Sequence, residues 1–170
     1  MPNMTASQKP SLGVTPTKVA DFFLAFAKET GESVTHLKLQ KLVYYAQAWH
    51  LANFETAIFD SDFQAWVHGP VLYELYKELG GAYPGDVVTT KSTLEEAKKA
   101  IGNGELTDFL EEVCRAYMRF GGYELELMTH QEAPWKDARH GMGPREESSN
   151  VITKEAIERY YRSVKNGEKA

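Results

Sequence analysis

Hydrophobic residues recur at helical spacing along most of the chain, and each run lies between typical helix start and stop signals. A first helix is expected from Pro16 to about Thr30, because Thr15 can cap it, proline suits the first helical position and Gly31 can end it. The same signals predict helices over residues 70–79, 92–101, 107–120, 123–128 and 153–165, with a short one starting near Pro134. Helix therefore dominates.

The helix expected over residues 36–53 has an unusual distribution of side chains, since apolar residues occupy two of its sides. One side carries Leu39, Leu42, Ala46 and Trp49, and another carries Leu37, Tyr44, Tyr45, Ala48 and Leu51. A helix that is apolar nearly all round is buried, so we place it at the centre of the fold. One narrow polar seam remains, formed by His36, Gln40, Gln47 and His50.

This polar seam has two interpretations. A buried polar group without a partner costs roughly 1–3 kcal/mol, so these side chains either hydrogen-bond loops packed across them or line a groove that receives a partner or ligand. We favour the first interpretation. Specifically, Gln47 and His50 are predicted to hold the turn over residues 66–70.

Between residues 57 and 67 the hydrophobic period changes to that of strands. Residues 57–59 and 63–67 are expected to pair around a turn at 60–62. The resulting fold class is mainly α (α+β by strict count): a compact multi-helix domain around a central buried helix, 36–53, with one small β-hairpin near 57–67. Residues 14–165 are expected to form a single domain, with flexible tails at 1–13 and 166–170.

Composition narrows the class of protein. Apolar residues are 42% and charged residues 25% of the 170, as in globular proteins, and no apolar run approaches the roughly 20 residues of a membrane span. The first dozen residues lack the apolar stretch of a signal peptide, and the lone cysteine cannot form an internal disulfide, so we expect a cytoplasmic protein without membrane contact. A net charge of −5 argues against nucleic acid as a partner and favours a partner protein with a basic surface.

Motifs for chemistry are missing from the sequence. The five histidines show neither His-Glu-x-x-His nor any other metal-ligand spacing, and no nucleophile elbow or phosphate-binding glycine loop occurs. We therefore predict no catalytic residue, no metal site and no cofactor, and a buried inert thiol at Cys114. The rival interpretation is a small hydrolase or nucleotide-handling enzyme whose pocket is lined by His50, His68 or His130.

Three blocks of sequence carry a family resemblance: KLQKLVYYAQAWHLA from Lys38, AWVHGPVLYELY from Ala65 and LMTHQEAPWKDAR from Leu127. In this order they resemble the Panacea domain, also called SocA-like or GepA-like and often phage-associated, over about residues 17–140. His68 departs from the aromatic residue expected before Gly-Pro. The positions that match the family motif are Lys38, Gln40, Lys41, Tyr44, Tyr45, Gln47, Trp49, His50, Trp66, Gly69, Pro70, His130 and Trp135.

The resemblance implies an antitoxin that neutralises a co-encoded toxin by direct binding, in a family whose toxins have many unrelated folds, alarmone-synthetase-like enzymes among them. The acidic net charge also suits a basic toxin that handles tRNA or nucleotides. Delivery of that partner to a protease is an alternative. A nucleic-acid-binding regulator would instead need a basic patch, for which Lys38, Lys41 and Lys91 are the candidates. We expect the motif to be mainly structural and the partner-binding face to use residues 57–67 and 81–92, with Tyr83 as a candidate anchor.

Overall fold

The computed structural model of the chain describes residues 9–81 and 83–168. Within them the chain is mainly helical with two small antiparallel sheets, which confirms the expected fold class. The helices are α1 (Pro16–Glu29), α2 (His36–Phe54), α3 (Tyr73–Glu78), α4 (Leu94–Ile101), α5 (Gly104–Tyr117), α6 (Gly122–His130), α7 (Ala133–Ala138) and α8 (Lys154–Lys165). The strands are β1 (Val34–Thr35), β2 (Phe63–Trp66), β3 (Gly69–Val71), β4 (Val87–Val88) and β5 (Val151–Ile152).

Short polar side chains begin most of the longer helices. Thr15 and Thr153 cap α1 and α8 as predicted, each accepting a hydrogen bond from the backbone N–H three residues on. The capping box of α4 uses Thr93 and lies one residue later than predicted. Helix α5 begins earlier than predicted, because the side chain of Asn103 accepts the N–H of Leu106 and caps it first.

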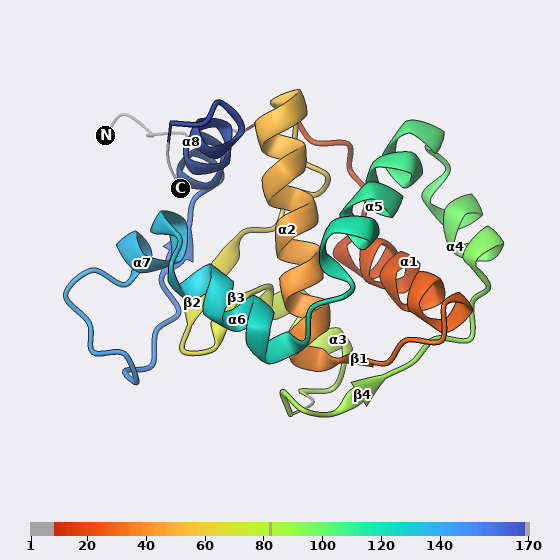
Figure 1. The fold of residues 1–170 in the computed structure, drawn as a ribbon, viewed down its shortest axis with the longest axis horizontal. Coiled ribbons are helices and arrows are strands. Elements are labelled where there is room, and N and C mark those ends of the chain that lie inside the picture. The colour runs from red at the N-terminus through yellow and green to blue at the C-terminus, as the bar shows by residue number, and fades with distance from the viewer. Residues whose placement is uncertain (1–8, 82, 169–170) are drawn as a thin grey trace, which may run out of the picture.

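Helix α2 lies at the centre of the molecule, as its side-chain pattern predicts. Helices α6, α7 and α8 lie on one side of it and α1, α4 and α5 on the other (Figure 1). Most of its residues are buried, and Leu39, Leu42 and Leu51 are fully buried. The core therefore surrounds α2, and any polar group on this helix has to find its partner inside the fold.

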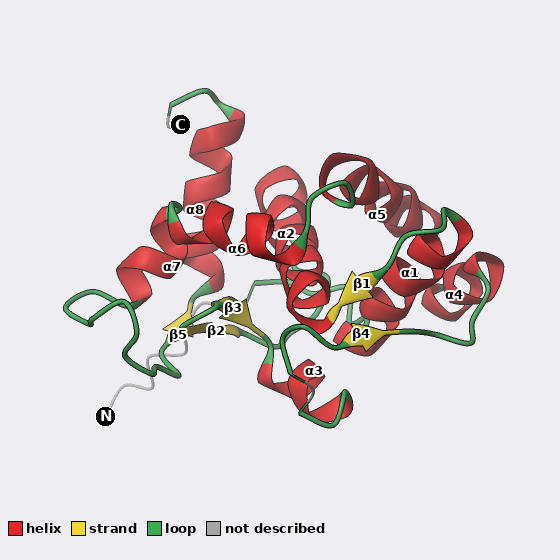
Figure 2. Cartoon of the chain, turned by 60° about the horizontal axis from the view of Figure 1, so that its bottom comes forward, coloured by secondary structure: helices red, strands yellow, loops and turns green. Residues whose placement is uncertain are grey.

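The hairpin forms one strand further along the chain than predicted. Strand β2 pairs with β3, so that Trp66 faces Gly69, and β5 pairs with the other side of β2. Both small sheets lie at one face of the helical layer, and α3 projects beyond them (Figure 2). The predicted strand at 57–59 instead makes a single bridge, between Ala57 and Ser11.

The predicted helix start at Gly69-Pro70 is also wrong, since both residues belong to β3 and α3 begins at Tyr73. Gly69 has a φ of 102°, which a glycine adopts readily and which lets the chain return along β2. Pro70 is tolerated because β3 is an edge strand, where a missing N–H removes no ladder hydrogen bond. Tertiary pairing thus overrides the local Gly-Pro signal for a helix.

Residues 10–14 run alongside residues 57–58. The N–H groups of Leu12 and Val14 donate to the carbonyls of Ala57 and Ile58, and the Ala57 N–H donates to Pro10. Residues 1–8 and 169–170 of the two expected tails lie outside the described residues. Among the described helices, none is long and apolar enough to cross a membrane.

Candidate functional site

Two glutamines of the polar seam fasten two different loops to α2. The Gln40 amide donates to the carbonyl of Leu72 (3.2 Å) and accepts from its N–H (2.9 Å). The Gln47 amide donates to the carbonyl of Phe59 (2.9 Å) and accepts from the N–H of Ile58 (2.7 Å). Each buried amide thus satisfies two backbone groups, which supports the interpretation that the seam holds packed loops.

The prediction that Gln47 and His50 hold the turn at 66–70 is wrong. His50 Nδ1 lies 2.5 Å from the carbonyl oxygen of Thr56. Gln47 and His50 therefore both hold the loop at 56–59. Burial lowers the pKa of His50. A helix rises about 1.5 Å per residue, so Gln47 and His50 lie about 10 and 15 Å further along α2 than Gln40. This distance places them beyond the reach of the hairpin.

Lys41 holds the hairpin. Its side chain is fully buried and Nζ donates to the carbonyl of Pro70 (3.0 Å). Burial lowers the pKa of Lys41 to about 7, while the nearby Glu126 acts in the opposite direction. A Cβ on Gly69 would lie 2.5 Å from Lys41 Cε and 2.9 Å from Thr129 Oγ1. The absence of a side chain at residue 69 is what lets the lysine reach the strand.

Lys38 and Trp49 connect α2 to the end of α5. Lys38 Nζ donates to the carbonyl of Met118 (2.5 Å) and lies 3.8 Å from a carboxylate oxygen of Glu32. The indole N–H of Trp49 donates to the hydroxyl of Tyr117 (2.6 Å). Lys38 is buried, and burial lowers its pKa. Its ammonium group is therefore not part of an exposed basic patch.

A partly buried carboxyl group joins α2 to α8. Glu132 Oε1 accepts the hydroxyls of Tyr45 (3.0 Å) and Tyr161 (2.6 Å). Tyr44 packs edge-on against Phe63 and Tyr161 in the same layer. Burial raises the pKa of Glu132 to about 7, and the two tyrosine hydrogen bonds oppose that rise.

The last two motif residues fix the hairpin from the other side. The indole N–H of Trp135 donates to the carbonyl of Trp66 (2.8 Å), and the ring of Trp135 stacks on His130 with centroids 3.9 Å apart. Burial lowers the pKa of His130. Together with α2, these residues hold separate segments at fixed positions.

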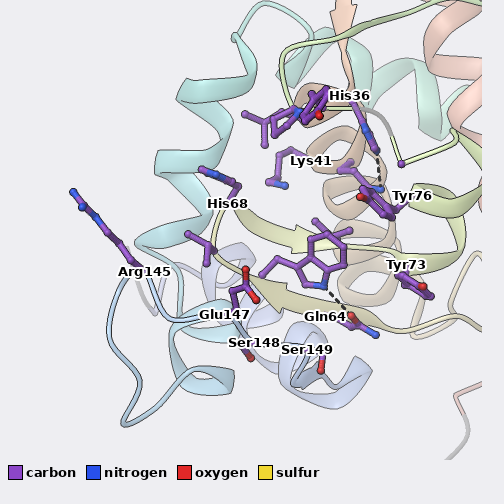
Figure 3. Close-up of a pocket in the computed structure, with 18 residues that line it drawn as sticks. His36, Lys41, Gln64, His68, Tyr73, Tyr76, Arg145, Glu147, Ser148 and Ser149 are labelled. Atoms are coloured by element: carbon purple, nitrogen blue, oxygen red, sulfur yellow. Dashed lines mark hydrogen bonds between the residues drawn. The ribbon is translucent and has the colours of Figure 1, made fainter.

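A groove of about 880 Å³ opens between the first turns of α2, the β2–β3 hairpin, α3 and two loops (Figure 3). The loops are those around residues 81–84 and 145–149. The lining residues are His36, Leu37, Gln40, Lys41, Gln64, Trp66, Val67, His68, Val71, Tyr73, Tyr76, Gly81, Tyr83, Pro84, Arg145, Glu147, Ser148 and Ser149.

Rings in mutual contact form one side of the groove, and we call His36, Trp66, Tyr73 and Tyr76 the aromatic wall. Tyr76 stacks on His36 (5.7 Å between centroids) and on Tyr73 (6.2 Å) and meets Trp66 edge-on (5.1 Å). The Trp66 indole N–H donates to Gln64 Oε1 (2.8 Å), which fixes the ring. The wall is thus built before any ligand arrives.

The groove takes in some of the sequence candidates and leaves out others. Gln40, Lys41, Trp66 and Tyr83 line it, and Tyr83 is 79% exposed. The remaining motif residues lie outside its lining and hold the scaffold together. Sequence reasoning missed the loop at 145–149, which has no periodic signal, and the tyrosines of α3, whose spacing of three residues was the available hint.

The three histidines of the rival enzyme interpretation, His50, His68 and His130, do not meet in one pocket, although His36 lines the groove together with His68. His68 lines the groove, with Nδ1 2.6 Å from Glu126 Oε1, whereas His50 lies at the far end of α2 and His130 behind the hairpin. Within residues 9–81 and 83–168, no group of three or more His, Cys, Asp or Glu side chains could hold a metal ion. Cys114 is buried as predicted, and burial raises the pKa of its thiol. What the groove offers is an aromatic surface for recognition.

Comparison with known proteins gives one match. The model of a protein family described as antitoxin SocA-like, Panacea domain, matches residues 39–136. Neither a curated protein nor a solved structure matches the chain. The matched segment begins within α2 and ends within α7, so it contains the seam except for His36, the hairpin and most of the groove.

Proposed function

The chain belongs to the SocA-like Panacea antitoxin family, and from this premise we propose that it neutralises a co-encoded toxin by binding it directly. The single observation that carries the proposal is the preformed groove, in which an aromatic wall adjoins the exposed Tyr83. Tyrosine and tryptophan are the residues that most often anchor protein–protein interfaces. The groove and the loop at 81–92 are therefore the face on which we place the toxin.

The side chains of the groove support binding rather than catalysis. An enzyme would need a nucleophile or general base with a second group to orient it, both reaching the same reacting atom. In the groove, Lys41 is fully buried against Pro70, and the three histidines of the enzyme interpretation do not converge, since only His68 lines it. The groove therefore supports a binding module better than an enzyme.

The partner is a toxic enzyme that acts on nucleotides or tRNA, the class that the family resemblance and the acidic net charge together indicate. Such enzymes carry basic surfaces for phosphate, and the net charge of −5 on this chain complements them. Complementary charge speeds association at low ionic strength. Raising the salt concentration is therefore expected to lower the association rate with the purified toxin, and a rate indifferent to salt would remove charge from the account of binding.

Co-expression tests the proposal. The neighbouring open reading frame is expressed alone and together with this chain, and growth is followed while the two proteins are purified through a tag on one of them. Toxicity that only co-expression relieves, with both proteins in one complex, is the expected result. Toxicity that persists despite soluble expression of both would contradict neutralisation of that protein.

The same experiment separates blocking from delivery to a protease. If this chain blocks its toxin, the steady-state amount of toxin stays the same or rises on co-expression, because the complex accumulates. A fall in toxin that disappears in a protease-deficient strain would identify delivery instead. A chain that rescues growth without entering a complex, at far below one copy per toxin, would point to an enzyme.

A further inference from the structure

The basic side chains that line the groove are engaged or turned away from it. Lys41 is fully buried and bonded to the carbonyl of Pro70, and the ring of His68 adjoins the carboxylate of Glu126. The guanidinium of Arg145 points out of the groove (Figure 3). None of the lysine or arginine side chains in the groove lining is therefore aimed at an incoming anion.

Glu147 is different, because its carboxylate points into the groove (Figure 3). The residue is exposed, and no described residue forms a hydrogen bond or ion pair with it. Its neighbour Glu146 is already engaged, since Oε2 accepts the N–H of Gly143 (3.0 Å). Glu147 thus places one unpaired negative charge beside the aromatic wall.

The aromatic wall also favours a cation. The faces of Trp and Tyr rings carry partial negative charge and attract ammonium or guanidinium groups within about 6 Å. Arginine adds a planar group that stacks on rings while its N–H donors pair with a carboxylate. The protein already shows such a contact at the edge of the groove, where Lys77 Nζ lies 5.2 Å from the ring centroid of Tyr73.

We propose that the groove receives an arginine side chain of the partner protein, with its guanidinium against the aromatic wall and paired with Glu147. This inference rests on the proposed function, since it names the chemistry that the toxin presents to the same face. Tyr83 stands at the rim of the groove, where it can close over the arginine and exclude water. The acidic net charge favours a basic partner surface around that anchor.

A peptide probe tests this without knowledge of the toxin. The probe is acetyl-Gly-Arg-Gly-amide, with the uncharged citrulline peptide and the glutamate peptide as comparisons, each titrated to about 20 mM because single-residue anchors bind near the millimolar range. The readout is the NMR signal of the Trp66 indole N–H. The indole N–H of Trp49, which is hydrogen-bonded to Tyr117 away from the groove, is the internal control.

We expect a saturable shift of the Trp66 signal with the arginine peptide and at least about fivefold weaker binding of the citrulline peptide. Glu147→Gln and Tyr73→Ala should each weaken the arginine peptide about three- to tenfold. The matched controls are Glu112→Gln, which makes the same charge change on an exposed face of α5, and Tyr123→Ala, which removes an exposed tyrosine of α6. Both controls should bind like the original chain.

Equal binding of arginine and citrulline, a preference for glutamate, or no shift at all would overturn the inference. So would a response to arginine that Glu147→Gln leaves unchanged. Co-expression distinguishes this failure from failure of the proposed function. If the chain still rescues growth and forms a complex, only the arginine anchor is wrong, whereas loss of rescue by the unmodified chain concerns the antitoxin role itself.

Discussion

The polar seam of α2 and the groove both include the first turns of this helix, but their characteristic side chains differ in burial. Gln40 and Gln47 of the seam, and the adjacent Lys41, are almost completely buried and hydrogen-bonded to backbone groups of other segments. On the groove side, Tyr83 is 79% and Tyr73 47% exposed, although both are large and apolar. Buried hydrogen-bonded groups maintain a fold, whereas exposed aromatic groups are available to a partner.

This contrast separates what the family motif does from what the protein recognises. Most motif residues lie in the first region, where they attach the hairpin, the loop at 56–59, α5 and α8 to one helix. This hub fixes the positions of the segments that border the groove, and three motif residues, Gln40, Lys41 and Trp66, also line it. Family members can then keep one scaffold and change the groove, which is a simple physical route to diverse partners.

The largest effect is expected at Gly69 of β3, where the packing against Lys41 and Thr129 leaves no room for a side chain. Gly69→Ala places a methyl group 2.5 Å from Lys41 Cε and 2.9 Å from Thr129 Oγ1 at a positive φ, so it should lower the free energy of unfolding by about 2–5 kcal/mol. Urea unfolding followed by circular dichroism measures this. Gly31→Ala is the matched control, because it also has a positive φ but nothing within 4 Å, and about 1 kcal/mol is expected.

Removal of one seam amide should have the next largest effect. Gln47→Ala leaves the Phe59 carbonyl and the Ile58 N–H without partners, which should lower the free energy of unfolding by roughly 2–4 kcal/mol. The exposed Gln131 is the control, and Gln131→Ala should change stability by no more than about 0.5 kcal/mol. A similar small effect at both positions would mean that the seam does not carry the stability assigned to it.

The pH dependence of stability should report on the partly buried carboxyl group. The pKa of Glu132 is raised from 4.5 to about 7 in the folded protein, so between these values the unfolded chain has lost a proton that the folded chain keeps. This group therefore makes stability fall by roughly 2–3 kcal/mol as pH rises from about 4.5 to 7, whereas the lowered pKa values of His50 and His130 act in the opposite direction.

Glu132→Gln removes that dependence while its amide oxygen still accepts from Tyr45 and Tyr161. Thermal unfolding at a series of pH values should show that, between pH 4.5 and 7, the stability of the original chain falls relative to that of this variant. Glu112→Gln on the exposed face of α5 is the control, and its stability should change with pH as that of the original chain does. Parallel pH profiles for all three proteins would contradict a shared proton at Glu132.

The smallest effect on folding is expected at the rim of the groove, where the effect on binding should be greatest. Tyr83→Ala should change the free energy of unfolding by no more than about 0.5 kcal/mol, because the side chain is exposed, yet weaken toxin binding by at least about tenfold if Tyr83 is an anchor. Titration calorimetry with the purified toxin measures the affinity of the original chain and of each variant. Tyr123→Ala, at a tyrosine of similar exposure on α6, should bind normally, and equal affinities for all three proteins would move the interface away from the groove.

Sequence reasoning located what depends on local patterns. The all-round apolar character of residues 36–53 predicted a central buried helix, and the threonines at 15 and 153 predicted two helix starts. The need of buried amides for partners predicted that the seam would bind backbone groups. The three sequence blocks also indicated the family. Each of these follows from side-chain spacing or from a cost that applies wherever the group is buried.

Only the tertiary structure decided which segments meet. Gly69 and Pro70 carry a local signal for a helix start, but pairing with β2 and the hydrogen bond from Lys41 make them a strand. The same holds for the groove, whose loop at 145–149 lies far along the sequence from α2 and α3. The sequence by itself determined that α2 would be buried with its polar groups satisfied, because hydrophobic period and hydrogen-bonding need are local properties. Their partners, and the groove between them, depend on long-range packing that no local pattern encodes.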